Sequence, residues 1–448
     1  MACVPTRPQI DCLIVGAGIS GLLIGIKILK DHPKLKVIIL EKYNYVGGRV
    51  TTYHKSLPHL GKIHWENGAG RISNTHKHIL GLIKHYGLHT RPIPDATEYR
   101  SKSGIISRIS FDDLIIPYAD TLRNSLEKTE LGQHTLAELI PDTLASPLFD
   151  RFPYWAEPNL LRADLALDAF TGDLSHKAGF SICVEGLGEL IKCLRSDFEK
   201  RGGVIYLGTE VQKIKHDFTT KYDIVSCLRT DKEHPQPSSV QLDIAARSTV
   251  LALHFSALKK IFTNSLPKSY PQPSFLTKLK MAPLVRIYAV FPTHAEKSWF
   301  SSQPHTVLPS PIRYFIPIQP SKGIVMISYS EGPDAQYWIE KLETYGEDMV
   351  KKEVMQHIRS AFPEKSPIPD PIFFKIHPWH DGCTYWLPGA YNPCEVSDES
   401  VHPVPDIFPT TFICGESTSI RQAWMEGALE QTEKLYMNTI FCDVLRDS

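Results

Sequence analysis

Residues 10–50 read IDCLIVGAGISGLLIGIKILKDHPKLKVIILEKYNYVGGRV. An apolar run at 10–15 leads into the turn 16–21, whose letters GAGISG fit the pattern GxGxxG. The pattern predicts a strand over 10–15, a helix over 22–30 that ends before Pro33, and a second strand over 37–40. This order of strand, glycine turn, helix and strand is typical of a parallel sheet that holds a dinucleotide at the turn.

The glycines of the turn have separate tasks in such a site. Gly16 permits the tight turn, Gly18 lets a pyrophosphate approach the backbone, and Gly21 lets the helix pack close to the strand. Ile19 and Ser20 lie between them, where the first N–H groups of the helix point toward phosphates. A turn of this kind often binds nothing when it stands alone, so further signals are needed.

Those signals follow at the expected spacing. Glu41 comes 20 residues after Gly21, at the end of the second strand, and Lys42 comes next. A carboxylate at this place accepts ribose hydroxyls. Gly48 and Arg49 then stand in EKYNYVGGRVTT, where small residues admit the diphosphate and ribityl chain of a flavin and a guanidinium bonds phosphate. A surface arginine in a loop is the alternative for Arg49, but the whole string favours a flavin site.

Composition excludes several classes of protein. The chain has 448 residues, more than one core usually fills, so two or three domains are expected. Its 49 Lys+Arg balance 49 Asp+Glu, which disfavours nucleic acid or an anionic membrane as a partner. The nine cysteines include no CxxC pair, which fits reduced thiols in a cytosol-like compartment. The apolar stretch 12–29 is interrupted by glycines and Lys27, so we expect a soluble cytoplasmic protein rather than a secreted or membrane-spanning one.

The rest of the chain predicts further elements around this unit. We expect a helix over about 75–86, a mixed helical insert over 95–175, and a helix after Gly186 that leads into a strand at 204–207. Strands are predicted at 248–253, 284–291, 312–318 and 323–329, which suggests an antiparallel-rich sheet, with a final strand at 408–414 and a helix from about 424. A polar loop occupies 231–240.

The two ends of the chain carry the resemblance to a known family. Together with residues 16–50, the segment FICGESTSIRQAWMEGALEQ at 412–431 resembles the FAD-dependent amine oxidase superfamily, which includes monoamine, polyamine and L-amino acid oxidases. The resemblance implies an α/β fold with a discontinuous Rossmann-like FAD-binding domain of the glutathione-reductase type and a substrate domain of mixed sheet plus helices. We assign residues 1–75, 179–255 and 371–448 to the first domain, and 76–178 (with the helical insert) and 256–370 to the second.

The resemblance also implies cofactor contacts. Glu416 would bond the ribityl chain after Gly415, the helix near Met425 would point its N–H groups at the flavin, and the backbone around Val211 would contact adenine. The full set of cofactor-binding residues predicted from motif and resemblance is Gly16, Gly18, Ile19, Ser20, Gly21, Glu41, Lys42, Gly48, Arg49, Gly70, Arg71, Val211, Gly415, Glu416 and Met425.

Within the superfamily, GAGRISNTHKHILGLIKHYGLHT at 68–90 looks most like the L-amino acid oxidase and tryptophan monooxygenase branch. Arg71 occupies the position of an arginine that holds the substrate carboxylate there, and a guanidinium suits this task because it pairs with a carboxylate through two parallel bonds. The alternative is that Arg71 bonds FAD or a neighbouring acid. Trp424 matches a tryptophan that walls the pocket, against simple core packing, and Tyr314 is the candidate for an aromatic cage, with an offset of one or two residues left open.

Two departures from the family pattern affect the chemistry. Many relatives carry a lysine that holds a water near flavin N5, but LVRIYAVF places Arg286 there. An arginine stays protonated and cannot act as a base. The covalent flavin linkage of monoamine oxidases needs a cysteine in the GGC that follows the tryptophan. By spacing from Trp379, Gly389-Ala390-Tyr391 fills that slot and Cys383 comes too early, so non-covalent FAD is favoured. Trp379 and Trp386 resemble a segment that lies close to the flavin.

Other constellations indicate no second site. His76, His78, His85 and His89 follow Arg71 without a carboxylate or cysteine to complete a metal shell, so we interpret them as a solvated histidine-rich face and predict no metal. Gly186-x-Gly188 lacks a third glycine and a phosphate-ready strand before it, which disfavours a separate NAD(P)H site.

The sequence thus predicts an FAD-dependent oxidase acting on an L-amino acid or primary amine. It would move hydride from the C–H next to the amine to the flavin and give an imine, which hydrolyses to a carbonyl product and ammonia, with O₂ reduced to hydrogen peroxide. Arg71, Trp424, Tyr314 and Arg286 are the candidate catalytic residues. The alternatives are a monoamine or polyamine oxidase without carboxylate recognition, and a flavin-binding protein with little turnover. Substrate side chain, homo-oligomeric state and pathway stay open.

Overall fold

The fold is described from a computed structural model for residues 10–446, apart from 59, 95, 102–103, 105, 110, 142–147, 150, 176–178 and 232–237. The predicted opening unit forms the centre of the first large sheet. Strands β1 (Ile10–Val15) and β2 (Val37–Leu40) pair in parallel and are joined by helix α1 (Ile19–Asp31). The helix begins three residues earlier than expected because Gly18, in an extended conformation, is its N-cap. The last residues of the glycine turn therefore form the first helical turn.

The first large sheet has the strand order β10-β2-β1-β13-β12-β11, and β19 pairs with β13. Strands β10 (Val204–Tyr206) and β19 (Thr411–Ile413) run parallel to their neighbours, whereas β11 (Thr209–Asp217), β12 (Tyr222–Asp231) and β13 (Ser238–Leu251) form an antiparallel meander. The sequence missed β12 and the first ten residues of β13. Those residues belong to the antiparallel part of the sheet, where the hydrophobic run is shorter than in the parallel part.

Helices cover this sheet with apolar faces. They are α2 (Lys77–His85), α9 (Leu187–Lys200), α10 (Phe255–Ser265), α14 (Met425–Tyr436) and α15 (Thr439–Arg446). The α1–α9 contact is close because Gly25 has no side chain: a Cβ there would lie 2.6 Å from the buried Phe198 ring. The core on this side of the molecule is therefore set by one small residue and one large one.

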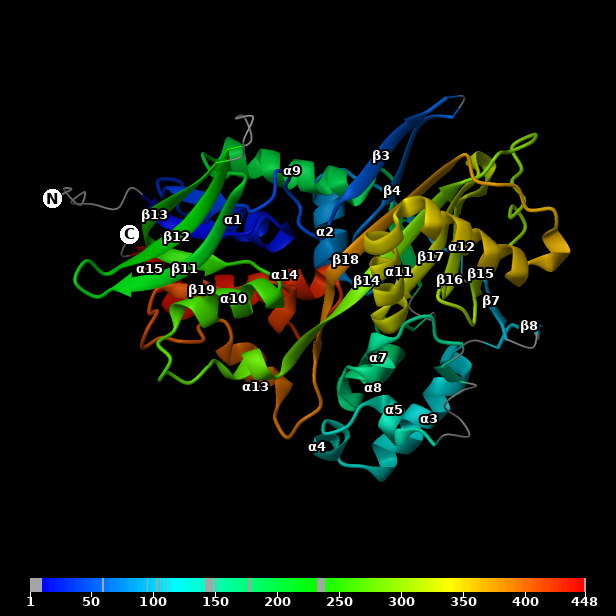
Figure 1. The fold of residues 1–448 in the computed structure, drawn as a ribbon. Helices are drawn as coiled ribbons and strands as arrows, with labels where there is room; N and C mark the ends of the chain where they lie inside the picture. The colour runs from blue at the N-terminus through cyan, green and yellow to red at the C-terminus, as the bar shows by residue number, and fades with distance from the viewer. Residues whose placement is uncertain are drawn as a thin grey trace.

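The second large sheet has the order β18-β14-β17-β16-β15-β7-β8. Its pairs are antiparallel except β15 with β7, as predicted for the strands at 284–291, 312–318 and 323–329. The strand predicted at 248–253 belongs instead to β13 of the first sheet, where it runs parallel to β1 and β19. The strands are β7 (Thr97–Arg100), β8 (Ile106–Ser107), β14 (Leu279–Val290), β15 (His305–Val307), β16 (Tyr314–Gln319), β17 (Ile324–Glu331) and β18 (Phe373–Trp386). Helices α11 (Gly332–Tyr345) and α12 (Glu347–Ala361) pack beside this sheet (Figure 1).

Strand β18 was not predicted, and it changes how the last segment of the chain is used. It pairs with β14 along nearly its whole length, with an irregularity at Ala282/Leu284 opposite Gly382. The segment 371–448, which the sequence assigns to the FAD-binding domain, therefore supplies a strand to the second sheet as well as β19 to the first. The other domain limits remain predictions.

The remaining elements form a helical body (Figure 1) and two small sheets. Helices α3 (Phe111–Ser125), α4 (Lys128–Leu131), α5 (Leu136–Leu139), α7 (Ala156–Asn159) and α8 (Ala163–Thr171) gather in one body, as the predicted helical insert (Figure 1). Small sheets are made by β3 (Thr52–Leu57) with β4 (Gly61–Glu66), and by β5 (Ile72–Ser73), β9 (Phe180–Cys183) and β6 (Thr90–Pro92); α13 (Pro393–Glu399) lies between β18 and β19 in the chain. In the part of the chain described, no helix combines the length and apolarity needed to cross a bilayer.

Candidate active site

A cavity of about 570 Å³ lies among β14, β16 and β17 of the second sheet, the small sheet β5-β9-β6, and the start of α14. Its volume falls in the range typical of small-molecule sites. Of the predicted residues, the cavity is lined by Gly70, Arg71, Arg286, Tyr314, Trp424 and Met425. The four candidate catalytic residues, which are spread over more than 350 positions of the sequence, therefore surround one space.

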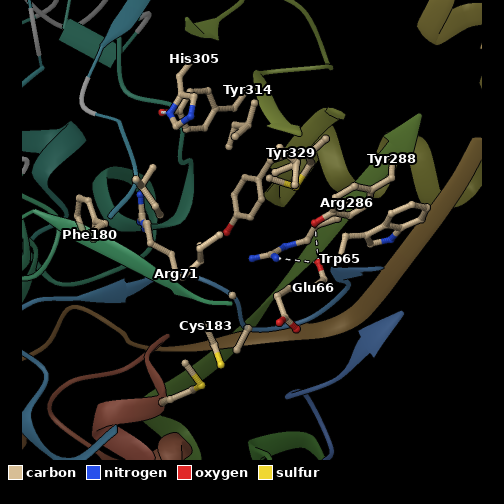
Figure 2. A pocket seen from close by; sticks show the side chains of 18 of the residues that line it. Trp65, Glu66, Arg71, Phe180, Cys183, Arg286, Tyr288, His305, Tyr314 and Tyr329 are labelled. Atoms are coloured by element: carbon tan, nitrogen blue, oxygen red, sulfur yellow. Dashed lines mark hydrogen bonds between the residues drawn. The ribbon is translucent and has the colours of Figure 1, made fainter. Parts of the chain in front are cut away.

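Arg71 points its guanidinium into an aromatic corner of this cavity (Figure 2). The guanidinium carbon lies 4.4 Å from the ring centre of Phe180, 5.1 Å from that of Tyr154 and 5.2 Å from that of Trp424. None of the ion pairs found among the described residues involves Arg71. The three rings pack around the cation, and no hydrogen bond from its N–H groups is found within the described part of the chain.

Trp424 is the N-cap residue of α14 and packs on both sides. Its ring lies parallel to that of Phe180, at 6.4 Å between centres, and meets the His76 ring edge-on at 4.8 Å. His76 itself is buried, and its Nε2 lies 3.3 Å from Asp173. The expectation of a solvated histidine face is therefore wrong for His76, because the first turn of α2 packs against α14; His78, His85 and His89 are exposed as expected.

Arg286 on β14 forms the opposite wall. Its Nη1 donates to the carbonyl oxygen of Glu66 at 3.1 Å, and the Tyr288 hydroxyl donates to the same oxygen at 2.6 Å. In the view of Figure 2, the Tyr329 ring stands between Arg71 and Arg286, and it lies 5.2 Å from the Arg286 guanidinium carbon. A Cβ at Gly70 would lie 3.2 Å from Arg286 Nη1. The glycine therefore lets the guanidinium approach the chain.

Glu66 lies beneath this wall and caps α9. Its two carboxylate oxygens accept hydrogen bonds from the Leu187 N–H at 2.7 Å and the Thr52 hydroxyl at 2.8 Å. Burial raises the pKa of Glu66 to about 7, although these two donors and Arg286 favour the charged form. Sequence reasoning missed Glu66, because nothing in its neighbouring letters distinguishes it from an ordinary surface carboxylate.

Arg49 and Glu416 meet although they are 367 residues apart. Arg49 Nη2 lies 2.9 Å from Glu416 Oε2, and its Nη1 donates to the Gly382 carbonyl at 2.9 Å. Glu416 also accepts from the Thr384 N–H at 3.0 Å and the Ala423 N–H at 2.9 Å. The two motifs at the ends of the chain are thus fixed to each other directly. Contacts of either residue with phosphate or ribityl stay predictions.

The glycine turn does not line the cavity, and its three glycines have different surroundings. A Cβ at Gly21 would lie 2.0 Å from the Gly16 carbonyl oxygen, and one at Gly16, where φ is +104°, would lie 2.4 Å from the Ala252 oxygen. A Cβ at Gly18 would meet no atom of the protein within 4 Å. Gly16 and Gly21 are therefore required by the fold, whereas the space above Gly18 is free. Gly48, at φ +59°, approaches Gly18 from the second loop.

Further predicted cofactor residues lie on or next to elements of the first sheet and α1. Glu41 is buried and accepts from the Ala17 N–H at 2.8 Å and the Tyr43 N–H at 2.9 Å, and burial raises its pKa. Lys42 is exposed and forms an ion pair with Glu210 at 3.2 Å. Val211 is buried in β11. Ile19 and Ser20 are buried in the first turn of α1, where the Ser20 hydroxyl donates to Ala428 of α14, and Gly415, at φ +122°, precedes Glu416.

Sequence reasoning missed several cavity residues. Tyr314 lines the cavity as predicted, but its hydroxyl is turned to the His305 ring at 3.4 Å. Tyr154 and Tyr329 also line the cavity, with ring centres 5.4 Å apart, and Tyr385 of β18 joins them in the lining. Tyr154 comes from the helical insert and Tyr385 from the unpredicted strand, so periodicity offered no means to place them.

Two buried carboxylates were missed as well. Glu157 of α7 and Glu331 at the end of β17 line the cavity, and both are more than nine-tenths buried. Burial raises the pKa of Glu157 to about 8, with a further rise from the nearby Glu331. Among the described residues, no group of three or more histidine, cysteine or acidic side chains has a geometry that could hold a metal ion.

Cys383 lines the cavity, whereas Gly389, Ala390 and Tyr391 do not. Tyr391 instead packs against Arg162, whose guanidinium carbon lies 4.6 Å from the ring centre. Burial raises the pKa of the Cys383 thiol well above its usual value, with a further rise from Glu416. The early position of Cys383 in the sequence therefore does not remove it from the site. Trp379 and Trp386 are held by hydrogen bonds to the Asn67 and Ser419 carbonyls, outside the cavity lining.

Comparison with known proteins decides the family. The sequence pattern of the flavin-containing amine oxidoreductases matches residues 19–150 and 113–433. The chain belongs to this family. Members contain flavin, and the cofactor of this protein is a flavin. Two solved structures with the same fold are cyclohexylamine oxidase from Brevibacterium oxydans, with a TM-score of 0.71 and 19% identity over 98% of this chain and 99% of that one, and putrescine oxidase bound to putrescine, with 0.66 and 14% over 98% of each.

Curated sequences match this family member only over short stretches. The mitochondrial L-2-hydroxyglutarate dehydrogenase of Dictyostelium discoideum is 40% identical over 65 residues, which are 14% of each chain. The uncharacterized protein R188 of Acanthamoeba polyphaga mimivirus is 30% identical over 87 residues, which are 19% of this chain and 16% of that one. The chain therefore matches less than a fifth of the length of either relative.

The residues present fit FAD. Gly18 caps α1 and leaves open space beside the first N–H groups of the helix, which have no intrahelical acceptors. Glu41 lies at the end of the adjacent strand, and each of its oxygens keeps a lone pair beyond the bond it accepts. The α1 turn, Glu41 and the Arg49–Glu416 pair would hold the nucleotide and the chain that leads to the cavity.

Proposed function

We propose that the protein is an FAD-dependent oxidase that removes hydride from the C–H bond next to the amino group of an L-amino acid. When bound, FAD would supply the acceptor for this hydride and the route by which the two electrons reach O₂. The imine product hydrolyses to a keto acid and ammonia. The observation that carries this proposal is the Arg71 guanidinium, which lies in the cavity against three aromatic rings and forms no ion pair in the described part of the chain.

Each wall of the cavity has a task in this reaction. Arg71 binds the substrate carboxylate through two parallel hydrogen bonds and so fixes the position of the α-carbon. Tyr154, Phe180 and Trp424 exclude water around that pair, which strengthens it. Arg286, held by the Glu66 carbonyl, places a permanent positive charge on the opposite wall. Because the lone pair of the amine must be free for hydride to leave easily, the rate is expected to rise with pH.

An alternative substrate is an amine without a carboxylate. The contacts of Arg71 with three rings favour it, since a guanidinium that stacks in this way can serve as part of the wall. The two alternatives differ in what removal of the charge at Arg71 would do to the two classes of substrate.

The test is anaerobic reduction of the flavin by a panel of amino acids and by the amines made by removing their carboxylates. We expect amino acids to bleach the yellow protein rapidly and the matching amines to do so slowly. Arg71→Met should lower kcat/KM for the best amino acid by about 100-fold, the loss typical of one partner of a buried charge pair, and leave the amine within about threefold.

Arg91→Met is the matched control, because Arg91 of β6 lines the same cavity but is exposed. It should leave the preference for amino acids unchanged. Equal reduction by an amino acid and its amine would contradict the role of Arg71. If nothing on the panel bleaches the protein while light does, it is a flavin-binding protein with little turnover.

A further inference from the structure

Glu157 and Glu331 form an acidic pair inside the cavity that the oxidation step does not use. Their exposed fractions are 6% and 5%. One oxygen of each is occupied: Oε1 of Glu331 accepts from the Tyr329 hydroxyl at 2.8 Å, and Oε1 of Glu157 accepts from the Tyr385 hydroxyl at 3.4 Å. The Oε2 atom of each is buried and makes no hydrogen bond of good geometry to a described residue, although the backbone N–H groups of Trp155 and Ala156 approach the Glu331 carboxylate and favour its charged form.

Two unpartnered carboxylate oxygens in one cavity are costly unless something pairs with them. The charge of Arg71 acts on both and lowers the pKa of each, but among the described residues Arg71 forms no ion pair with either. Burial remains the largest influence and raises the pKa of both. A primary ammonium has three N–H donors and could meet both oxygens together, so it would satisfy what the protein leaves open.

We propose that Glu157 and Glu331 bind the positively charged end of the substrate, and that the substrate is an amino acid whose side chain carries a second amino group. The inference rests on the proposed oxidation of an amino acid and names the substrate class of that reaction. Its charges complement the cavity: the carboxylate pairs with Arg71 and the distal ammonium with the two glutamates. The α-amine stays neutral and gives up hydride.

The experiment compares L-lysine with L-norleucine, which has the same chain without the second amino group. We expect lysine to reduce the flavin with a kcat/KM about 100-fold higher, as for a buried charge pair. Glu331→Gln and Glu157→Gln should each remove most of that preference and leave the rate with norleucine within about threefold. Each glutamine keeps an oxygen that can accept the tyrosine hydrogen bond, so the fold is retained.

Ser330→Ala is the matched control on the same strand. Ser330 is fully buried and does not line the cavity, so its loss should leave the lysine preference intact. A second measurement needs no turnover: the photoreduced holoenzyme is titrated with lysine and with norleucine in a calorimeter under nitrogen. Lysine should bind about 100-fold more tightly than norleucine, and the glutamine variants should bind both alike.

The outcomes separate the two proposals. Norleucine and lysine reducing the flavin equally well would overturn the ammonium site while leaving amino acid oxidation in place. A loss with both substrates in Glu331→Gln would also overturn it, since the glutamates would then support the structure only. If 1,5-diaminopentane, which lacks the carboxylate, reduces the flavin as fast as lysine does, the result would support ammonium binding by the acidic pair and contradict carboxylate binding by Arg71. Binding of lysine without reduction would uphold the pair and refute the oxidase.

Discussion

The first crossover and the cavity are built in opposite ways. The strand–turn–helix over residues 10–31 lies in one stretch of sequence, and its three glycines act on neighbours that are close along the chain or in the adjacent strand. The cavity takes Arg71 from the residue just before β5, Glu157 from a short helix in the insert, Arg286 from β14 and Tyr385 from β18. The crossover is specified by one local segment of the sequence, whereas the cavity exists only after remote segments have folded together.

This difference shows where sequence motifs carry information. In the crossover, Gly16 and Gly21 are needed by the backbone itself, and Gly18 is needed by neither backbone nor side chains of the protein. A motif can thus combine positions that the fold requires with a position that it does not require. The residue types that line the cavity also occur elsewhere in the chain, where they face solvent, so residue type alone does not mark function.

The largest expected effect is on stability, and it distinguishes Gly21, which the fold requires, from Gly81, which it does not. Gly21→Ala should lower the free energy of unfolding by at least about 3 kcal/mol, because its Cβ would lie 2.0 Å from the Gly16 oxygen. Gly81→Ala, in the interior of α2 with no atom near its Cβ, should raise it by about 0.5–1 kcal/mol. Urea unfolding followed by circular dichroism measures both, and equal midpoints would show that close packing at Gly21 has been misjudged.

The next effect concerns the ligand position. Gly18→Ala should leave the unfolding of the flavin-free protein within about 0.5 kcal/mol of the parent, because alanine adopts the extended conformation found here and meets no protein atom. Its Kd for FAD should rise about 100-fold, close to 3 kcal/mol, measured by quenching of flavin fluorescence. Unchanged affinity would mean that no phosphate approaches Gly18.

A smaller effect depends on pH. Burial raises the pKa of Glu66 from 4.5 to about 7. The folded state therefore favours the protonated form, and its contribution to stability is complete below about pH 4.5 and is lost as pH rises through 7. Relative to the parent, the free energy of unfolding of Glu66→Gln should therefore rise by about 2–3 kcal/mol between pH 4.5 and 8. Urea unfolding midpoints across this range measure the difference. Gly81→Ala changes no charge, so its free energy of unfolding should differ from that of the parent by the same amount at every pH.

A pH-independent difference for Glu66→Gln would place that carboxylate in contact with solvent. This result would also sharpen the comparison, because Glu66 links the cavity wall to the start of α9.

The smallest expected effect is at Cys383. The raised pKa keeps its thiol protonated and weakly nucleophilic, so FAD should be released by acid precipitation, and Cys383→Ser should keep the same flavin content. Intact mass spectrometry checks this: an increase in chain mass equal to FAD in the parent, absent in the variant, would show a covalent link.

The structure confirms the parts of the fold that local patterns specify and adds those that pairing decides. The limits of β1 and β2 agree with prediction because parallel strands buried on both faces are continuous apolar runs. Strand β18 was missed because FFKIHPWHDGCTYW mixes polar, aromatic and glycine residues without a clear period, and only its ladder with β14 makes it a strand. Arg71, Arg286, Tyr314 and Trp424 were placed in one site by resemblance, whereas Glu157 and Glu331 had no motif to mark them.

The amino-acid sequence by itself determined the dinucleotide turn, the family and the arginine in the pocket, because these depend on the spacing of a few residues along one segment. Only the tertiary structure decided which acids, tyrosines and cysteine share the cavity with Arg71, and that two carboxylate oxygens there lack partners. The physical reason is that burial and charge pairing depend on distances in space, which a chain sets only when remote strands and helices have packed.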